Sequence, residues 1–244
     1  MIVGFALKIK STDVGDTAIP SPPAPLSGGE GRNAPPAPLP LEEGRNLPTI
    51  GIVGGIGSGK SLVAKIMQTL GGYLIAADPL GHEALQQADI RAKLAERWGS
   101  AVLDEQGNVD RKPLGRIVFA DVTELKALEA LVFPYIEKRI LQEMAYARTR
   151  PDVKFIVLDA AILLETGWHE YCGKIVFVDA PRAVRLTRLK DKRGWNEQEL
   201  ERREKVQLPV EEKRGHADAV IVNDGDYDKV AGQVQVTLEQ WKVI

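Results

Sequence analysis

One eight-residue segment, residues 54–61, limits the possible folds of this chain more than any other feature. Its sequence, GGIGSGKS, has glycine, glycine, lysine and serine at the four fixed positions of a phosphate-binding loop. An apolar run suited to a strand precedes it at 50–53, and 62–70 is predicted to form an amphipathic helix. Strand, glycine-rich loop and helix are the context in which such a loop binds phosphate. The alternative is a glycine-rich turn with a chance lysine, and the flanking segments argue against it.

The residue types of the loop suit phosphate chemistry. Glycine lets backbone N–H groups approach phosphate oxygens and reaches backbone angles that other residues avoid. Lys60 can neutralise the outer phosphates, and the hydroxyl of Ser61 can bind Mg²⁺. The loop therefore predicts a site for a nucleotide phosphate chain.

Composition narrows the class of protein. The chain has 244 residues, with 32 Lys and Arg against 34 Asp and Glu, so its formal net charge is −2. A chain with so little net charge has no strong electrostatic attraction that would bind it nonspecifically to nucleic acid or to a membrane surface. The single cysteine, Cys172, rules out an internal disulfide framework, and we expect a cytoplasmic protein. We also expect neither a membrane span nor a signal peptide, since the apolar runs are strand-sized.

The first 48 residues differ from the rest. Residues 21–33 and 34–46 repeat one 13-residue unit that keeps PPAPL and GRN. This composition predicts a disordered or polyproline-like extension, 1–48, before an ordered domain over 49–244. A ligand for an SH3-type domain is one alternative, and an inert extension or a misassigned start site is the interpretation that we favour.

Strand and helix signals alternate beyond the loop. Further strands are expected at 73–76, 154–158, 174–178 and 219–222, and helices at 80–98, 121–132, 134–148, 181–190, 197–213 and 227–241. Continuous apolar strands alternating with helices predict an α/β fold, a P-loop NTPase-type parallel sheet covered by helices on both faces. Ligands of such folds bind at the carboxyl ends of the strands.

Two carboxylates occupy such strand ends. Asp78 follows the second strand, where it can accept the proton of an acceptor hydroxyl or orient it. Its alternative role is the N-cap of a helix that begins with Pro79. Asp159 ends an apolar strand, the arrangement that holds Mg²⁺ in many P-loop enzymes, but a structural aspartate is as common there. Glu165 is a weaker candidate, and Asp179 is expected to be a turn residue.

Basic residues gather between 182 and 193. Such cations can close over a nucleotide and stabilise the charge of a transferring phosphate, although a solvated charged face is the usual explanation. We favour a role for Arg188, with Arg193 as a second candidate, and leave Arg182 and Arg185 open. His82, His169 and His216 do not have metal-ligand spacing.

A series of short motifs over about 49–244 resembles the dephospho-CoA kinase family. The matching segments are the loop IGIVGGIGSGKS, AAD at 76–78, FP at 133–134, LDAAILLE at 158–165, RLTR at 185–188, Gln207 and ADAVIVNDG at 217–225. The resemblance implies ATP-dependent phosphorylation of the ribose 3′-hydroxyl of dephospho-CoA, the last step of coenzyme A synthesis. It also implies a five-stranded parallel core, a helical acceptor-binding region at about 80–150 and a lid at about 185–205.

The resemblance also implies roles for single residues. Asp78 matches the family's catalytic aspartate, Arg188 its lid arginine, and Lys60 and Ser61 its phosphate and Mg²⁺ residues. Asp159 is the second expected metal ligand. The residues expected along ATP are Gly55, Ile56, Gly57, Ser58, Gly59, Lys60, Ser61 and Leu62, with Asn223 and Gly225 near the adenine.

The chain departs from the family at several positions. This chain has Ala76 where the family usually has aspartate, and Leu62 where it has threonine. It has Phe133 in place of a histidine and Arg185 in place of a glutamine. Residues 161–163 are Ala-Ile-Leu where the family has Pro-Leu-Leu. None of these changes removes Lys60, Ser61 or Asp78. A kinase for another nucleoside-like acceptor and a nucleotide-binding regulator without transfer activity are the alternatives.

Overall fold

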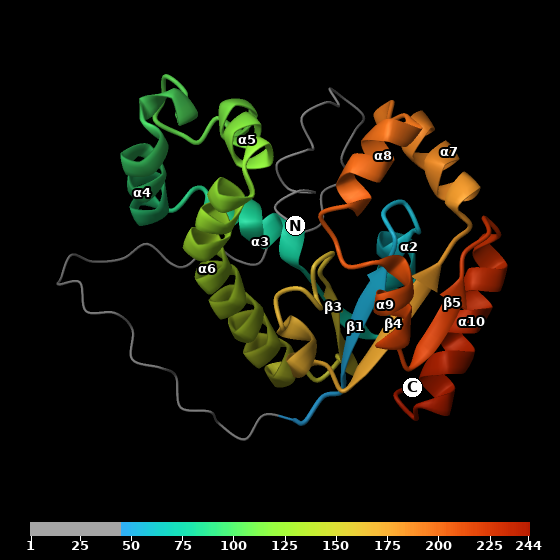
Figure 1. Cartoon of the computed structure of the whole chain (residues 1–244). Helices are drawn as coiled ribbons and strands as arrows, with labels where there is room; N and C mark the ends of the chain where they lie inside the picture. The colour runs from blue at the N-terminus through green and yellow to red at the C-terminus, as the bar shows by residue number, and fades with distance from the viewer. Residues whose placement is uncertain (1–44) are drawn as a thin grey trace.

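A parallel five-stranded sheet forms the centre of the molecule. The computed structural model describes residues 45–244. The strand order is β2-β3-β1-β4-β5, with all four neighbouring pairs parallel (Figure 1). The bounds are β1 Thr49–Gly54, β2 Gly72–Ala76, β3 Phe155–Asp159, β4 Lys174–Asp179 and β5 Ala219–Val222. The predicted α/β fold with a parallel sheet is confirmed.

The two faces of the sheet are covered by different helices. Every residue of β1 is buried, as expected for a central strand with helices on both sides. Ile50 and Ile52 face a core shared with α2 (Lys60–Thr69) and α10 (Tyr227–Gln240). Val53 belongs to the second core, which the helical region on the other face completes. This alternation along β1 follows from the two-residue period of a strand.

The helical region on the second face contains α3 (Ala77–Ala84), α4 (Ala88–Trp98), α5 (Arg111–Ala120) and α6 (Val122–Thr149), with a 3₁₀ turn, η1, at Ser100–Val102 (Figure 1). The prediction of one helix over 80–98 was wrong, because α3 ends at Ala84 and α4 begins after Gln87. The sequence analysis also missed α5, whose helical pattern is interrupted by Pro113 and Gly115. The carboxylate of Asp110 caps α5 by accepting from the N–H of Lys112 (2.9 Å).

Helix α6 is one continuous helix of 28 residues, so the prediction of two helices separated at Pro134 was wrong. Proline removes one backbone donor and usually ends or kinks a helix. Here a buried stripe runs through the proline without interruption, and packing of that stripe outweighs the local preference. Its residues are Leu128, Val132, Ile136, Ile140, Met144 and Ala147.

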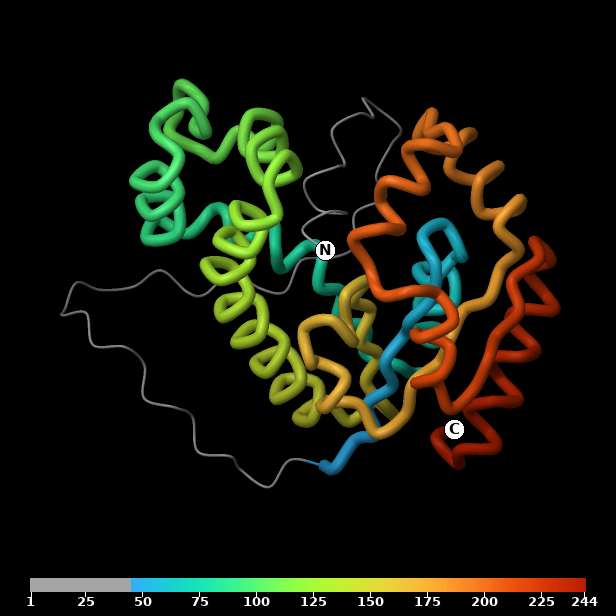
Figure 2. The backbone as a smooth tube through the Cα atoms, in the orientation of Figure 1, coloured from blue at the N-terminus to red at the C-terminus, as the bar shows by residue number. Residues whose placement is uncertain are grey.

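Three further helices, α7 (Arg182–Arg193), α8 (Glu197–Glu204) and α9 (Val210–Gly215), lead from β4 to β5. Figure 2 shows the chain rising from β4 into α7 and α8 and returning past the loop between β1 and α2. The expected helix over 197–213 is two helices, because Leu208-Pro209 interrupts it and Pro209 becomes the N-cap of α9. A second 3₁₀ turn, η2, spans Trp168–Tyr171 after β3.

The segment just before β1 is anchored to the domain. The guanidinium of Arg45 donates to the carbonyls of Arg150 (3.1 Å), Pro151 (3.2 Å) and Val153 (3.0 Å), and Leu47 is only 5% exposed. The anchored chain thus begins at least four residues before Thr49, ahead of the boundary expected from composition. The proline-rich extension otherwise lies outside the described residues. Over 45–244 the helices include none that is both long and apolar enough to cross a membrane.

Candidate active site

The phosphate-binding loop joins the carboxyl end of β1 to the N-terminus of α2. Gly59 is the N-cap of α2 and has a φ of 96°, a left-handed conformation that favours glycine. A Cβ atom at Gly59 would lie 2.1 Å from Nδ2 of Asn223, so the position also has no space for a side chain. The loop and the start of α2 therefore lie together at the carboxyl end of β1, where a helix N-terminus can bind an anion.

The side chain of Lys60 reaches back to the first residues of this loop. Its ammonium donates to the carbonyls of Gly54 (3.0 Å) and Gly55 (3.1 Å). Burial lowers the pKa of Lys60 to about 8, and the neighbouring carboxylate of Asp159 partly opposes that shift. The cation of Lys213 lowers the pKa of Lys60 further. An anionic ligand beside Lys60 would therefore raise its pKa and favour the charged ammonium.

Asp159 lies beside the start of α2. It is the last residue of β3 and pairs in register with Ile52 of β1 and Ala76 of β2. Burial raises the pKa of Asp159, while Lys60 and a hydrogen bond with the side chain of Ser61 oppose that rise. The hydroxyl of Ser61 and the carboxylate of Asp159 are therefore neighbours here.

Asp78 is the second residue of α3 and remains partly exposed. The alternative role of N-cap was wrong, because Ala76 is the N-cap and no side chain caps α3. Asp78 is close enough to raise the pKa of both Lys60 and Asp159. Four residues from three segments of the chain, Lys60, Ser61, Asp78 and Asp159, therefore meet at the carboxyl end of the sheet.

Arg188 and Asn223 brace the far side of the loop. Both donate to the carbonyl of Ser58, Asn223 through Nδ2 (2.8 Å) and Arg188 through its guanidinium (3.3 Å). Arg188 also donates to Oδ1 of Asn223 (2.9 Å). Gly225 lies close by with a φ of 125°. The structure thus brings the candidates Arg188, Asn223 and Gly225 to the loop.

Arg185, which the sequence analysis left open, also belongs to the loop. Its guanidinium is packed over Gly55, donates to the carbonyl of Ile56 (3.1 Å) and pairs with Glu204 of α8 (2.6 Å). Arg185 is 6% exposed, so it is not part of a solvated face. Its position one helical turn before Arg188 was the available signal, because residues three apart share a helix face.

Lys213, which the sequence did not single out, lies behind the site with Glu165, a weaker candidate, and Gln207 of the motif series. The ammonium of Lys213 is 2% exposed and contacts Glu165 (2.9 Å), Gln207 (3.0 Å) and the carbonyl of Ala161 (3.3 Å). Glu165 also accepts from the backbone N–H of Leu208 (3.1 Å). These contacts tie the segment between α8 and α9 to the loop after Asp159. Their wide separation in sequence explains why no local pattern indicated them.

Other candidates lie apart from this cluster. Arg193 stacks on the ring of Trp195 (5.0 Å), and Arg182 pairs with Glu197. Asp179 ends β4 and pairs with Arg214 (2.7 Å), so it is more than a turn residue. Histidine, cysteine and acidic side chains of residues 45–244 form no group of three that could hold a metal.

Comparisons with known proteins agree with this geometry. The family model described as dephospho-CoA kinase matches residues 48–229. A dephospho-CoA kinase of Bacillus licheniformis is 36% identical over 80% of this chain and 97% of its own length. The crystal structure of TT1252 from Thermus thermophilus superposes with a TM-score of 0.69 at 32% identity, covering 80% of this chain and 98% of that one. The structure of a dephospho-CoA kinase from Campylobacter jejuni superposes with a TM-score of 0.53 at 26% identity. The match covers 79% of this chain and 96% of that one.

Proposed function

Because the chain belongs to the dephospho-CoA kinase family, we propose that its loop holds ATP while Asp78 presents the ribose 3′-hydroxyl of dephospho-CoA to the γ-phosphate. Phosphorylation of dephospho-CoA by ATP is the last step of coenzyme A biosynthesis. The observation that carries this assignment of roles is the meeting of Lys60, Ser61, Asp78 and Asp159 at one end of the sheet.

The nucleotide lies along the loop in this proposal. The phosphates of ATP lie along residues 55–62, and the charge of Lys60 stabilises the transferring phosphoryl group. The buried hydroxyl of Ser58 has no hydrogen-bond partner within residues 45–244, which supports a ligand at this loop. Asn223 and Gly225 lie near the adenine, and Arg188 links that end to the loop.

Asp78 acts on the acceptor. Its carboxylate is partly exposed at the start of α3, so a hydroxyl can reach it from the side of the helical region. There it accepts the hydroxyl proton, or orients the hydroxyl, as the oxygen attacks the γ-phosphorus, the bond from that phosphorus to the β–γ bridging oxygen breaks and ADP leaves. Lys60 and Arg188 then stabilise the negative charge that spreads over the transferred group.

Ser61 and Asp159 are the residues that would hold Mg²⁺. The hydroxyl of Ser61 lies close enough to the carboxylate of Asp159 to lower its pKa, and both groups are oxygen ligands of the kind that Mg²⁺ prefers. A buried carboxylate whose pKa is raised gains from a cation beside it, so these residues fit the metal. When bound, Mg²⁺ would neutralise charge on the phosphate oxygens.

Two parts of the chain flank this centre. Helices α3 to α6, about residues 80–150, bind the rest of the acceptor, and a lid at about 185–205 covers the nucleotide. Arg185 and Arg188 support the second assignment, because they connect α7 directly to the phosphate-binding loop. A closing lid excludes water from the transfer.

The test is ATP turnover with a panel of acceptors, with the phosphorylated product identified by mass. Dephospho-CoA should have the highest kcat/KM, and adenosine and AMP should lose kcat as well as affinity, because remote contacts orient the reacting hydroxyl. If a nucleoside or nucleotide has a higher kcat/KM than dephospho-CoA, the proposed acceptor is wrong. Omission of Mg²⁺ should abolish turnover with every acceptor.

A further inference from the structure

One arginine of the helical region is held by a neutral partner instead of an acid. The guanidinium of Arg111, the first residue of α5, lies 2.7 Å from Nδ1 of His82 on α3. A guanidinium can only donate, so Nδ1 accepts and the imidazole proton is on Nε2. The positive charge of Arg111 is therefore not neutralised by His82.

Among the described residues, Arg111 shares the lack of an acidic partner with Arg91, whose partners are Gly107 and Asn108, and differs from two other arginines of the region. Arg97 pairs with Glu124 (2.9 Å) and Arg139 with Glu83 (2.9 Å). Within residues 45–244, no carboxylate forms an ion pair with Arg111, although its side chain is partly buried. A partly buried cation without a carboxylate is suited to an anionic ligand.

Helix α3 places this pair next to the reacting hydroxyl. Ala77, Leu80, Gly81 and Ala84 are its buried residues and face the core. Asp78 and His82 are four residues apart, so they share a different, partly exposed face of α3. One helical turn, about 5.4 Å, separates them along the helix axis.

The acceptor has a matching arrangement of groups. In dephospho-CoA only the ribose ring and one methylene group separate the 3′-hydroxyl from the 5′-diphosphate. The hydroxyl and the diphosphate are thus about one helical turn apart, the same separation as Asp78 and His82 along α3.

We propose that Arg111, positioned by His82, binds the 5′-diphosphate of the acceptor and selects acceptors that carry one. The inference rests on the proposed function, in which Asp78 receives the 3′-hydroxyl. Arg111 is then a specificity-determining residue, and His82 is a positioning residue that acts through it.

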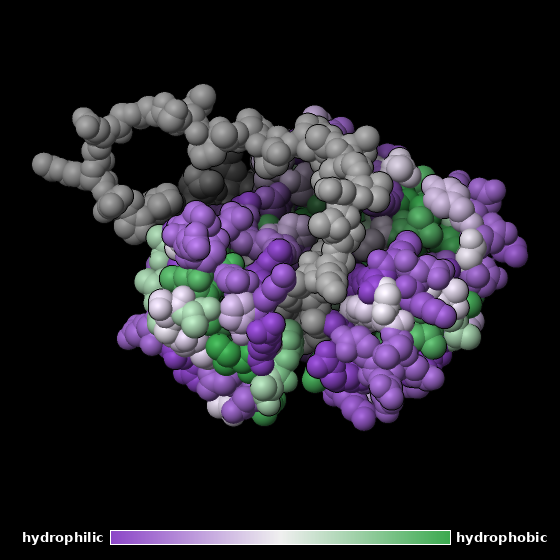
Figure 3. All heavy atoms as spheres, turned by 90° about the horizontal axis from the view of Figure 1, so that it is seen from above, coloured by the Kyte–Doolittle hydropathy of each residue, from purple (hydrophilic) through white to green (hydrophobic). Residues whose placement is uncertain are grey.

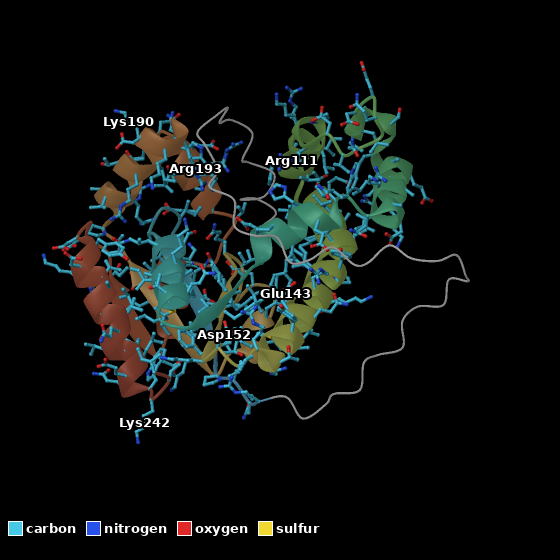
Figure 4. The ribbon with its side chains drawn as sticks, turned by 180° about the vertical axis from the view of Figure 1, so that it is seen from behind. Arg111, Glu143, Asp152, Lys190, Arg193 and Lys242 are labelled. Atoms are coloured by element: carbon cyan, nitrogen blue, oxygen red, sulfur yellow. The ribbon has the colours of Figure 1, made fainter. Side chains whose placement is uncertain are left out.

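The surroundings agree with an anionic ligand. Figure 4 shows Arg111 of α5 and Arg193 of α7 on the sides of the two helical regions that face each other. Figure 3 shows that hydrophilic side chains prevail on the visible surface of both regions at this end of the molecule. Two cations that face each other are favoured when an anion lies between them.

The experiment compares three ligands. Dephospho-CoA has the diphosphate and the pantetheine arm, ADP-ribose has the diphosphate and a second ribose but no pantetheine arm, and adenosine has neither diphosphate nor arm. Arg111→Ala should lower kcat/KM for the first two by about 10- to 100-fold, the effect of a charge-assisted hydrogen bond, and leave adenosine unchanged. Arg111→Lys keeps the charge and should retain most of the wild-type kcat/KM for dephospho-CoA and ADP-ribose. Titration calorimetry with the same ligands measures the same selectivity without turnover.

Arg116→Ala is the matched control, because Arg116 is an exposed residue of the same helix. It should match the wild type with all three ligands. An equal loss for adenosine and dephospho-CoA in Arg111→Ala would overturn the proposal and make Arg111 a structural residue. Wild-type protein that phosphorylates none of the three would refute the proposed function instead, and calorimetry would still decide whether Arg111 binds the diphosphate.

Discussion

The side chains of Arg188 and Asn223 hydrogen-bond to each other and share one acceptor, the carbonyl of Ser58. Arg188 comes from α7 and Asn223 follows β5, so two distant segments hold the same turn of the phosphate-binding loop. Asn223 is 2% exposed, and its backbone N–H donates to the carbonyl of Asp179 (2.7 Å). The brace is therefore buried and fixed from behind, which keeps the backbone donors of the loop in place.

Removal of the Asn223 side chain should weaken both stability and nucleotide binding. Asn223→Ala removes the Nδ2 donor of the Ser58 carbonyl and the Oδ1 acceptor of Arg188 from a buried site, and we expect a loss of about 1–3 kcal/mol in the free energy of unfolding. The KM for ATP should rise as well. Asn223→Asp keeps an acceptor for Arg188 and should retain more stability. Urea unfolding measures both variants, with the exposed Asn108→Ala as control; equal stability of Asn223→Ala and wild type would contradict the role of the brace.

The lowered pKa of Lys60 predicts how ATP binding depends on pH. The ligand-free protein loses the Lys60 charge as pH rises through about 8. Phosphates favour the charged amine, so ATP binding should take up protons above that pH and the Kd should increase. Calorimetry in buffers of different ionisation enthalpy measures the uptake. Lys60→Ala should show no such uptake and a kcat lower by about 10²- to 10³-fold. Proton uptake that persists in this variant would assign the titration to another group.

The same pKa has a consequence for stability. Lys60 binds fewer protons in the folded chain than in the unfolded chain between about 8 and the ordinary value of 10.5. This group therefore makes the folded protein more stable as pH rises through that range. Comparison of wild type with Lys60→Met by urea unfolding at several pH values isolates the contribution, and an opposite slope of the difference would show that burial does not control this lysine.

Asp78→Asn should separate catalysis from folding. If Asp78 is the acceptor's base, kcat should fall by about 10²- to 10⁴-fold. Because Asp78 lies in the first turn of α3 without capping it, stability should change by less than about 1 kcal/mol. Asp121→Ala is the converse control, since Asp121 does cap α6 through the N–H of Thr123 (2.7 Å). It should lose about 1 kcal/mol and keep its kcat. Normal turnover by Asp78→Asn would exclude the proposed role.

The contact between Arg185 and Glu204 should behave as a coupled pair. Glu204→Gln leaves a buried guanidinium without its acid, and we expect a loss of roughly 2 kcal/mol, below the 3–5 kcal/mol of a fully buried pair. Arg185→Gln should suppress this effect, giving a coupling of at least about 1 kcal/mol in a double-mutant cycle. Glu201→Gln, an exposed change on the same helix, is the control and should stay within about 0.5 kcal/mol. Additive single effects would mean that the contact contributes nothing specific.

Two truncated chains test where the domain begins. A chain starting at Arg45 should melt and turn over like the full chain, because the proline-rich repeat is poor in residues that build a core. A chain starting at Thr49 also loses the Arg45 hydrogen bonds and the burial of Leu47, which together should lower stability by at least about 1.5 kcal/mol. Calorimetric melting decides, and equal melting temperatures for the two truncated chains would mean that this anchor does not stabilise the domain.

The sequence by itself determined the elements whose signals are local. The phosphate-binding loop, all five strands and the helices α2, α7 and α10 follow from runs of neighbouring residues, and Asp78 and Asp159 could be chosen because they follow strands. The motif series also indicated the family. Local rules were insufficient where packing dominates: α6 continues through Pro134 because its buried stripe is uninterrupted, and Pro113 and Gly115 concealed α5.

Only the tertiary structure decided which of these residues meet. The strand order β2-β3-β1-β4-β5 brings Asp159 beside the start of α2, although about a hundred residues separate Asp159 from Ser61. Arg185 contacts Ile56, and Asn223 contacts Ser58, across 129 and 165 residues of chain. Contacts of this kind have no sequence period. They depend on how the sheet and its helices pack, so the brace, the Arg185–Glu204 pair and the buried Lys213 appear only in the folded chain.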